Sequence, residues 1–173
     1  MSTPSIYVLD TSVFTTAARF YYAFDILPEF WGHLMEEASK GRIISIDRVY
    51  DELVRYKDRL AQWAKREFRT YFASTRDDPT VLVAYRDVVA WVSHQDQYKE
   101  AAKTEFARAD NADAWVIAYA RAKACSLVTQ EKFNPDKRNK VPIPNVCRAL
   151  GITCLDTFEL LRQLGIKMGS SQA

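Results

Sequence analysis

The sequence contains few of the residues on which several common enzyme sites depend. Its 173 residues include only five glycines and two histidines, His33 and His94. Neither a G-x-x-x-x-G-K-[ST] loop nor a G-x-G-x-x-G loop occurs, so the usual nucleotide-cradling sites are not supported. Two histidines that stand alone in the sequence also give no support to a Ser-His-Asp catalytic triad.

Cysteine is equally scarce, because only Cys125, Cys147 and Cys154 occur and they are widely spaced. The odd number and the absence of a C-x-x-C pair argue against a disulfide framework and against a thiolate zinc site. We therefore expect buried cysteines that behave as small apolar residues in a reducing cytoplasm.

No apolar stretch approaches the ~20 residues that a membrane-spanning helix needs, and no leader segment is evident. The formal net charge is only +2, so any affinity for nucleic acid must come from local patches. One candidate patch runs from Arg55 to Arg76 and contains seven basic residues but only two acidic ones. Aromatic residues are interspersed among them, including Trp63, Phe68, Tyr71 and Phe72. These features predict a cytoplasmic protein that does not bind membranes and that has local surfaces able to contact RNA.

Short apolar runs alternate with helical patterns along the chain. The runs at 6–9, 43–46, 125–129 and 152–155 predict buried strands, and the segments between them have helical spacing. This alternation predicts an α/β fold, a three-layer α/β/α sandwich around a short parallel sheet. We expect one domain over 1–167, with a helical insertion at 57–97 after the second strand, and a disordered tail at 168–173.

Acidic residues follow three of the predicted strands. Asp10 comes directly after the first strand and Glu131 shortly after the third, and Asp113 begins the helix that leads into the third strand. Asp51 and Glu52 lie on the helix after the second strand, and periodicity does not decide which of them faces the sheet. Because helix N-termini and strand carboxyl ends share one edge, these carboxylates can converge there, where Mg²⁺ would compensate their repulsion.

Several of these positions have simpler structural interpretations. Asp10, Thr11 or Ser12 could cap the helix that follows the first strand, and Asp47 could cap the helix that follows the second strand. Asp110 is a candidate cap for the helix that contains Asp113.

The acidic positions also carry a resemblance to PIN domains. It rests on four segments: Val8-Leu9-Asp10-Thr11-Ser12, Tyr50-Asp51-Glu52-Leu53, Ala112 to Ala120, and Val128-Thr129-Gln130-Glu131. Two further segments, Ile143 to Cys147 and Leu155 to Leu161, resemble an uncharacterised prokaryotic branch of PIN-like proteins related to VapC-type toxins.

The resemblance implies a ribonuclease that depends on Mg²⁺ or Mn²⁺, with Asp10, Glu52, Asp113 and Glu131 as catalytic and metal-binding residues. It favours Glu52 over Asp51. Many PIN domains have an aspartate where this chain has Glu131, so Glu131 or Asp110 could complete the site. The resemblance also implies RNA as substrate and an antitoxin protein as partner.

Further residues are candidates for contacts with RNA or with a second copy of the chain. Thr11 and Ser12 could position a water or phosphate, and Lys132, Lys137 and Arg138 lie in a basic loop beside the predicted site. A homodimer would use aromatic residues such as the four tryptophans, Trp31, Trp63, Trp91 and Trp115.

Two other functions compete with the nuclease. One is a non-catalytic PIN-like module that binds RNA or a protein. The other is a phosphatase-type hydrolase with Asp10 as nucleophile. That chemistry usually has a second acid two residues later, where this chain has Ser12.

Overall fold

A computed structural model describes residues 5–169 and shows one parallel sheet of five strands in the order β3-β2-β1-β4-β5. The central strand is β1, and its Val8 is paired with Ile44 of β2 and with Leu127 of β4. The last four residues of the predicted disordered tail lie outside the described residues. The strands are β1 (Tyr7–Leu9), β2 (Ile43–Ile46), β3 (Phe72–Ala73), β4 (Ser126–Val128) and β5 (Cys154–Leu155).

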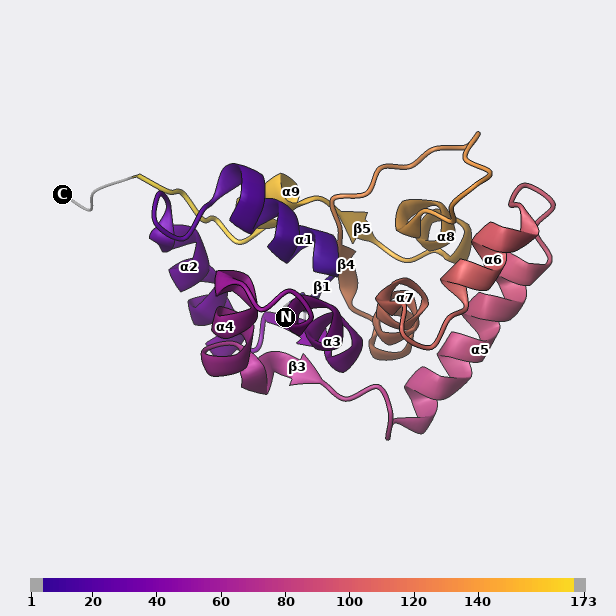
Figure 1. Ribbon diagram of the computed structural model, residues 1–173, viewed down its shortest axis with the longest axis horizontal. Helices are drawn as coiled ribbons and strands as arrows, with labels where there is room; N and C mark the ends of the chain where they lie inside the picture. The colour runs from indigo at the N-terminus through magenta and orange to yellow at the C-terminus, as the bar shows by residue number, and fades with distance from the viewer. Residues whose placement is uncertain (1–4, 170–173) are drawn as a thin grey trace.

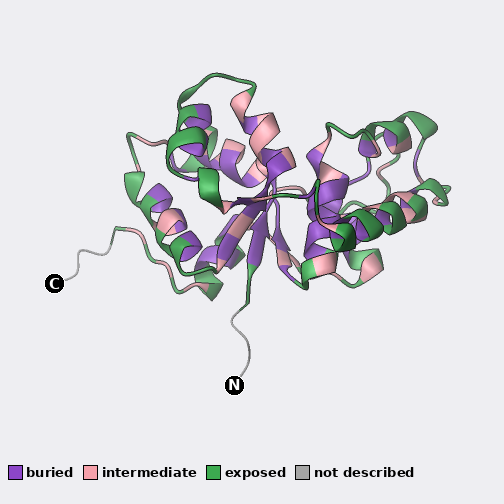
Figure 2. Cartoon of the chain, turned by 90° about the horizontal axis from the view of Figure 1, so that it is seen from below, coloured by how far each residue is buried: buried purple, intermediate pink, exposed green. Residues whose placement is uncertain are grey.

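Helices cover both sides of the sheet, as the sequence predicts for a three-layer sandwich (Figures 1 and 2). In Figure 1, α1, α2, α4 and α9 lie on one side of the strands, and α5, α6, α7 and α8 lie on the other. None of the helices within residues 5–169 is long and apolar enough to cross a membrane. The helices are α1 (Thr11–Thr16), α2 (Pro28–Ser39), α3 (Asp47–Val54), α4 (Arg59–Arg66), α5 (Pro79–Ser93), α6 (Glu100–Phe106), α7 (Ala112–Lys123), α8 (Ile143–Leu150) and α9 (Thr157–Gln163).

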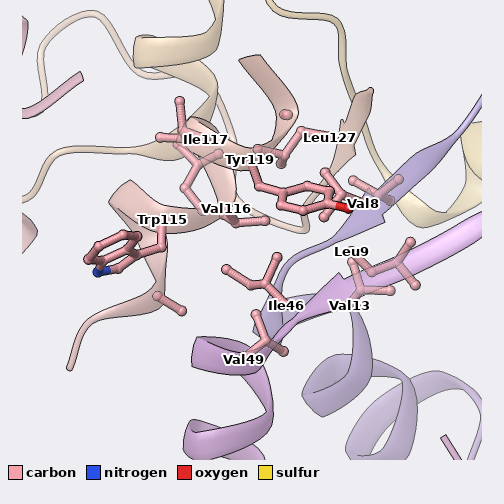
Figure 3. Packing of buried hydrophobic residues seen from close by; sticks show 14 of the residues in the cluster. Val8, Leu9, Val13, Ile46, Val49, Trp115, Val116, Ile117, Tyr119 and Leu127 are labelled. Atoms are coloured by element: carbon pink, nitrogen blue, oxygen red, sulfur yellow. The ribbon is translucent and has the colours of Figure 1, made fainter. Parts of the chain in front are cut away.

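The core lies where α7 packs on β1, β2 and β4. Most residues of α7 are buried, and four of them are alanines, which let the helix approach the sheet closely. Figure 3 shows Val116, Ile117 and Tyr119 of this helix in the same buried cluster as Val8 of β1 and Leu127 of β4. This packing fixes the N-terminus of α7 at the edge where the strands end.

The segment 57–97 is helical over α4 and α5, as predicted, but it is also part of the sheet and the core. It supplies β3, which pairs with β2 in parallel. This strand was not predicted, because a strand of two residues has no detectable periodicity. Phe68 from this segment is fully buried against Phe14 of α1, and α5 packs along α7.

Two predicted helix caps are wrong. Asp47 is the first residue of α3 rather than its cap, and its carboxylate instead accepts hydrogen bonds from Thr75 and Arg76. The cap of α7 is Asn111, not Asp110, because the Asn111 side chain accepts a hydrogen bond from the N–H of Asp113 at 2.9 Å. Both errors arise because several polar residues near a helix start can serve as caps, and long-range contacts select among them.

Candidate active site

Asp10 lies directly after β1 and is almost fully buried, with 3% of the residue exposed. Its backbone N–H donates to the carbonyl of Val128 in β4 at 2.9 Å. Its Oδ2 atom accepts hydrogen bonds from Ser12 Oγ at 2.6 Å and from Thr129 Oγ1 at 3.0 Å. Burial raises the pKa of Asp10 from 3.8 to about 6, although the Ser12 hydrogen bond lowers it, and the charge of Glu131 adds to the increase. The backbone N–H of Ser12 also donates to Asp10, which therefore caps α1 as well.

Glu52, rather than Asp51, is the acid of α3 that faces this site. Its Oε2 atom accepts a hydrogen bond from Thr11 Oγ1 at 2.5 Å, and its Oε1 atom accepts one from the N–H of Ala112 at 2.9 Å. Asp51 instead forms an ion pair with Arg76 at 2.6 Å. Glu52 thus joins the start of α1 to the start of α7, an arrangement that helical periodicity left undecided.

Asp113 lies in the first turn of α7, close to the other acids. Its pKa is raised well above the usual value, mainly by burial and then by the negative charges of Asp10, Glu131 and Glu52. The positive charge of Lys140 acts in the opposite direction. Within residues 5–169 the Asp113 carboxylate accepts no hydrogen bond, so its charge is compensated only weakly.

Glu131 completes the acidic group but already has partners of its own. Its Oε1 atom is paired with the ammonium group of Lys140, and its Oε2 atom accepts a hydrogen bond from the N–H of Ile143 at 2.8 Å. Glu131 therefore binds the N-terminus of α8, where a negative charge is favourable. Its charge still raises the pKa of both Asp10 and Asp113, which places all four acids in one electrostatic group.

The four acids differ in how many carboxylate oxygens they keep free for a metal ion. In the part of the chain that the structure describes, no three acidic, histidine or cysteine side chains surround one point as they stand. Glu52 and Glu131 each have both oxygens in hydrogen bonds or ion pairs, whereas Asp10 uses only Oδ2. Asp10 and Asp113 thus keep free oxygens that repel each other, and such oxygens suit Mg²⁺, which needs few carboxylates because it retains several waters.

The remaining predicted contact residues have different environments. Thr11 and Ser12 hold the carboxylates of Glu52 and Asp10. Lys132 forms an ion pair with Asp156 at 3.2 Å, beside the acids. The backbone carbonyls of Lys137 and Arg138 accept hydrogen bonds from Gln97 and Lys99, so these two residues attach the loop to the segment between α5 and α6.

Several residues that were candidates for the metal site, for RNA contacts or for a dimer lie elsewhere or are buried. Asp110 is exposed and paired with Arg108 at 2.8 Å, outside the acidic group. The aromatic residues Trp63, Phe68 and Phe72 in the basic segment are buried, so they cannot stack on RNA bases. Three of the four tryptophans, Trp31, Trp63 and Trp115, are buried as well and offer no surface for a dimer.

Two residues that the sequence analysis did not single out contribute to the site. Thr129 holds Asp10, and Lys140 neutralises Glu131 and lies near Asp113. The position of Thr129 at the end of a central strand was a usable signal. Lys140 carried no comparable signal, because it lies nine residues beyond Glu131 in a loop with several other basic residues.

Replacing Thr129 with valine should destabilise the protein at pH 7.5 by about 1.5–3 kcal/mol, because a buried hydrogen bond to a charged group is lost. The same change should raise the pKa of Asp10 further, since the Thr129 hydrogen bond lowers it. Urea unfolding and an NMR titration of the Asp10 carboxyl carbon measure both effects. Thr129→Ser, which keeps the hydroxyl group, is the control. An unchanged Asp10 pKa in Thr129→Val would contradict this role.

Two solved structures are similar to this chain. The chain is similar to VapBC2 from Rickettsia felis bound to a promoter DNA fragment, with 14% identity, a TM-score of 0.52, and coverage of 87% of this chain and 98% of that chain. It also matches VapBC-1 from nontypeable Haemophilus influenzae, with 14% identity, a TM-score of 0.48, and coverage of 87% and 97%.

The first of these structures shares the PIN-like α/β/α fold of VapC, which confirms the predicted fold class. No curated protein matches the sequence. A family model described as a domain of unknown function, DUF4411, matches residues 7–168. The chain, with its PIN-like fold, therefore belongs to the DUF4411 family.

Proposed function

We propose that this protein is an endoribonuclease that depends on Mg²⁺ or Mn²⁺. The observation that carries the proposal is the convergence of Asp10, Glu52, Asp113 and Glu131, which come from four separate segments. Glu52 and Glu131 lie close enough to raise the pKa values of Asp10 and Asp113. A group of carboxylates at the carboxyl edge of a parallel sheet destabilises the folded protein through charge repulsion unless a bound cation compensates it. The PIN-like fold is consistent with this function.

In this proposal Asp10 and Asp113 would hold the metal ion, because they retain free oxygens, and Glu52 and Glu131 would support them. When bound, the ion would supply an activated water and would stabilise negative charge on the oxygens of the phosphodiester group. Thr11, Ser12 and Thr129 keep the carboxylates in place through their hydroxyl groups. Lys140 is paired with Glu131 and thereby offsets part of the negative charge that would repel the phosphate backbone of RNA at this edge.

We further propose that the protein acts with an antitoxin. The similar structure from Rickettsia felis is a VapBC complex, and this supports a protein partner for this chain. A partner that covers the acidic edge could place an arginine among the carboxylates, since arginine pairs with carboxylates through two parallel hydrogen bonds.

Asp113→Asn tests the nuclease activity, and Asp110→Asn is a matched control from the same stretch of chain. We expect Asp113→Asn to weaken Mn²⁺ binding by about 10–100-fold, the range seen when the environment of a metal is altered. Asp110→Asn should leave binding unchanged, because Asp110 is paired with Arg108 outside the acidic group. Calorimetric Mn²⁺ titration and cleavage of single-stranded RNA, with EDTA as a blank, provide the two measurements.

The competing functions give different results in the same experiment. A non-catalytic module would bind RNA but cleave none of it with either metal, and would refute the nuclease. A phosphatase would release phosphate from a small ester through a covalent intermediate on Asp10. The second acid that such a phosphatase usually has two residues after its nucleophile is replaced here by Ser12, which donates its hydroxyl hydrogen to Asp10. This argues against the phosphatase.

A further inference from the structure

A cavity of about 500 Å³ lies beside the acidic group, between the loop that follows β4 and the start of α9. Two residues of the acidic site, Thr129 and Glu131, also line this cavity. Its volume falls in the range of about 300–1,000 Å³ that is typical of small-molecule sites. A molecule bound in the cavity would therefore adjoin the carboxylates to which the proposed function assigns catalysis.

We propose that this cavity is a nucleobase subsite, which holds the base of one nucleotide of single-stranded RNA next to the phosphodiester bond that is cleaved. The inference rests on the proposed function, because that function supplies the class of substrate.

The first support is an aromatic ring available for stacking. Phe133 lines the cavity and remains 44% exposed, although it is an apolar residue in a charged loop. The guanidinium of Arg148 lies 4.5 Å from the centre of the Phe133 ring and also borders the cavity. Aromatic rings and guanidinium planes are the groups on which proteins stack unpaired bases.

The remaining walls suit a flat base with polar edges. Pro144, Ile152 and Leu155 provide apolar surface. The Asp156 carboxylate is fully used, because it accepts hydrogen bonds from the N–H of Glu159 and from Lys132. Glu159 uses only Oε2, so its Oε1 atom can accept a hydrogen bond from the N–H groups of a base.

The charges around the cavity favour a base over a phosphate. Within residues 5–169, three carboxylates line it, those of Glu131, Asp156 and Glu159, together with the side chains of Lys132 and Arg148. Lys132 is already paired with Asp156. Glu131 is likewise paired with Lys140, so the charges at the cavity nearly cancel and offer no net attraction to a phosphate, whereas a neutral base with N–H donors needs none. The backbone phosphates would then lie outside the cavity.

Binding of fluorescein-labelled single-stranded RNA of about nine nucleotides, measured by anisotropy in EDTA, tests the subsite without any cleavage. We expect Phe133→Ala to weaken binding on the order of tenfold, because a stacked base is lost. Phe133→Tyr should bind like the wild type. Phe158→Ala is the matched control, since Phe158 is 43% exposed but does not line the cavity. An oligomer of equal length that lacks bases should bind equally well to the wild type and to Phe133→Ala.

The possible failures are distinguishable. Equal affinity of Phe133→Ala and wild type for the base-bearing RNA, an equal loss with the oligomer that lacks bases, or no binding by the wild type would each overturn the subsite. If the wild type cleaves RNA while Phe133→Ala binds normally, the subsite fails and the nuclease stands. If base binding depends on Phe133 but no cleavage occurs with Mg²⁺ or Mn²⁺, the subsite stands and the nuclease fails.

Discussion

Asp10→Asn is expected to stabilise the metal-free protein at pH 7.5 by up to about 3 kcal/mol and to reduce RNA cleavage by at least about a hundredfold. The stabilisation follows from burial, which is the main cause of the rise in the Asp10 pKa from 3.8 to about 6. A difference of about two pKa units between the folded and unfolded states corresponds to roughly 3 kcal/mol. Asparagine keeps the shape of the side chain and removes the charge.

The pH dependence has a definite sign. Because the folded-state pKa lies above the unfolded one, the folded protein binds more protons between about pH 4 and pH 6. The contribution of Asp10 to stability is therefore fully present below about pH 4 and is lost as the pH rises through about 6. Asp10→Asn should remove this loss, so its advantage over the wild type should appear near pH 7.5 and disappear near pH 4.

Thermal unfolding in EDTA across this pH range, with RNA cleavage in Mn²⁺, measures the two opposite effects. The loss of activity is expected to be large, because changes in the surroundings of a metal already cost about 10–100-fold. Asp96→Asn is the control, since Asp96 is exposed and its side chain has no ion pair or hydrogen bond within residues 5–169. Retained cleavage in Asp10→Asn would rule out Asp10 as a catalytic ligand, and reduced stability at pH 7.5 would show that its charge is structural.

Phe68→Ala is expected to lower the free energy of unfolding by about 3–5 kcal/mol, the usual cost of removing a buried aromatic ring. Phe68 is fully buried, and its ring centre lies 5.6 Å from that of Phe14 and 5.0 Å from that of Trp63. It therefore joins the segment that supplies α4 and β3 to the helix that begins after Asp10. Such a loss would show that this segment is part of the cooperative core.

Urea unfolding measures this effect, and Phe20→Ala provides the comparison because Phe20 is 78% exposed. The change at Phe20 should stay within about 0.5 kcal/mol. If Phe68→Ala does not fold, Phe68→Leu keeps an apolar side chain and should show a smaller loss of the same sign. A loss below about 1 kcal/mol for Phe68→Ala would mean that residues 57–73 fold independently of the sheet.

The sequence by itself determined those features that depend only on residues close together along the chain. Short apolar runs located four of the five strands, and β2 spans Ile43–Ile46 as predicted. The same local pattern identified Asp10 and Glu131 as residues that follow strands. In a parallel sheet the carboxyl ends of the strands share an edge, so the place where the acids gather could be predicted without coordinates.

Only the tertiary structure decided which partner each polar group takes. Asp51 and Glu52 are adjacent in the sequence, but Arg76 binds the first, while Thr11 and Ala112 bind the second. The pairing of Glu131 with Lys140 likewise depends on how the loop after β4 folds back. These contacts join residues far apart or in irregular loops, and a partly buried charge takes whichever donor the packing brings to it. Local patterns carry no information about that choice.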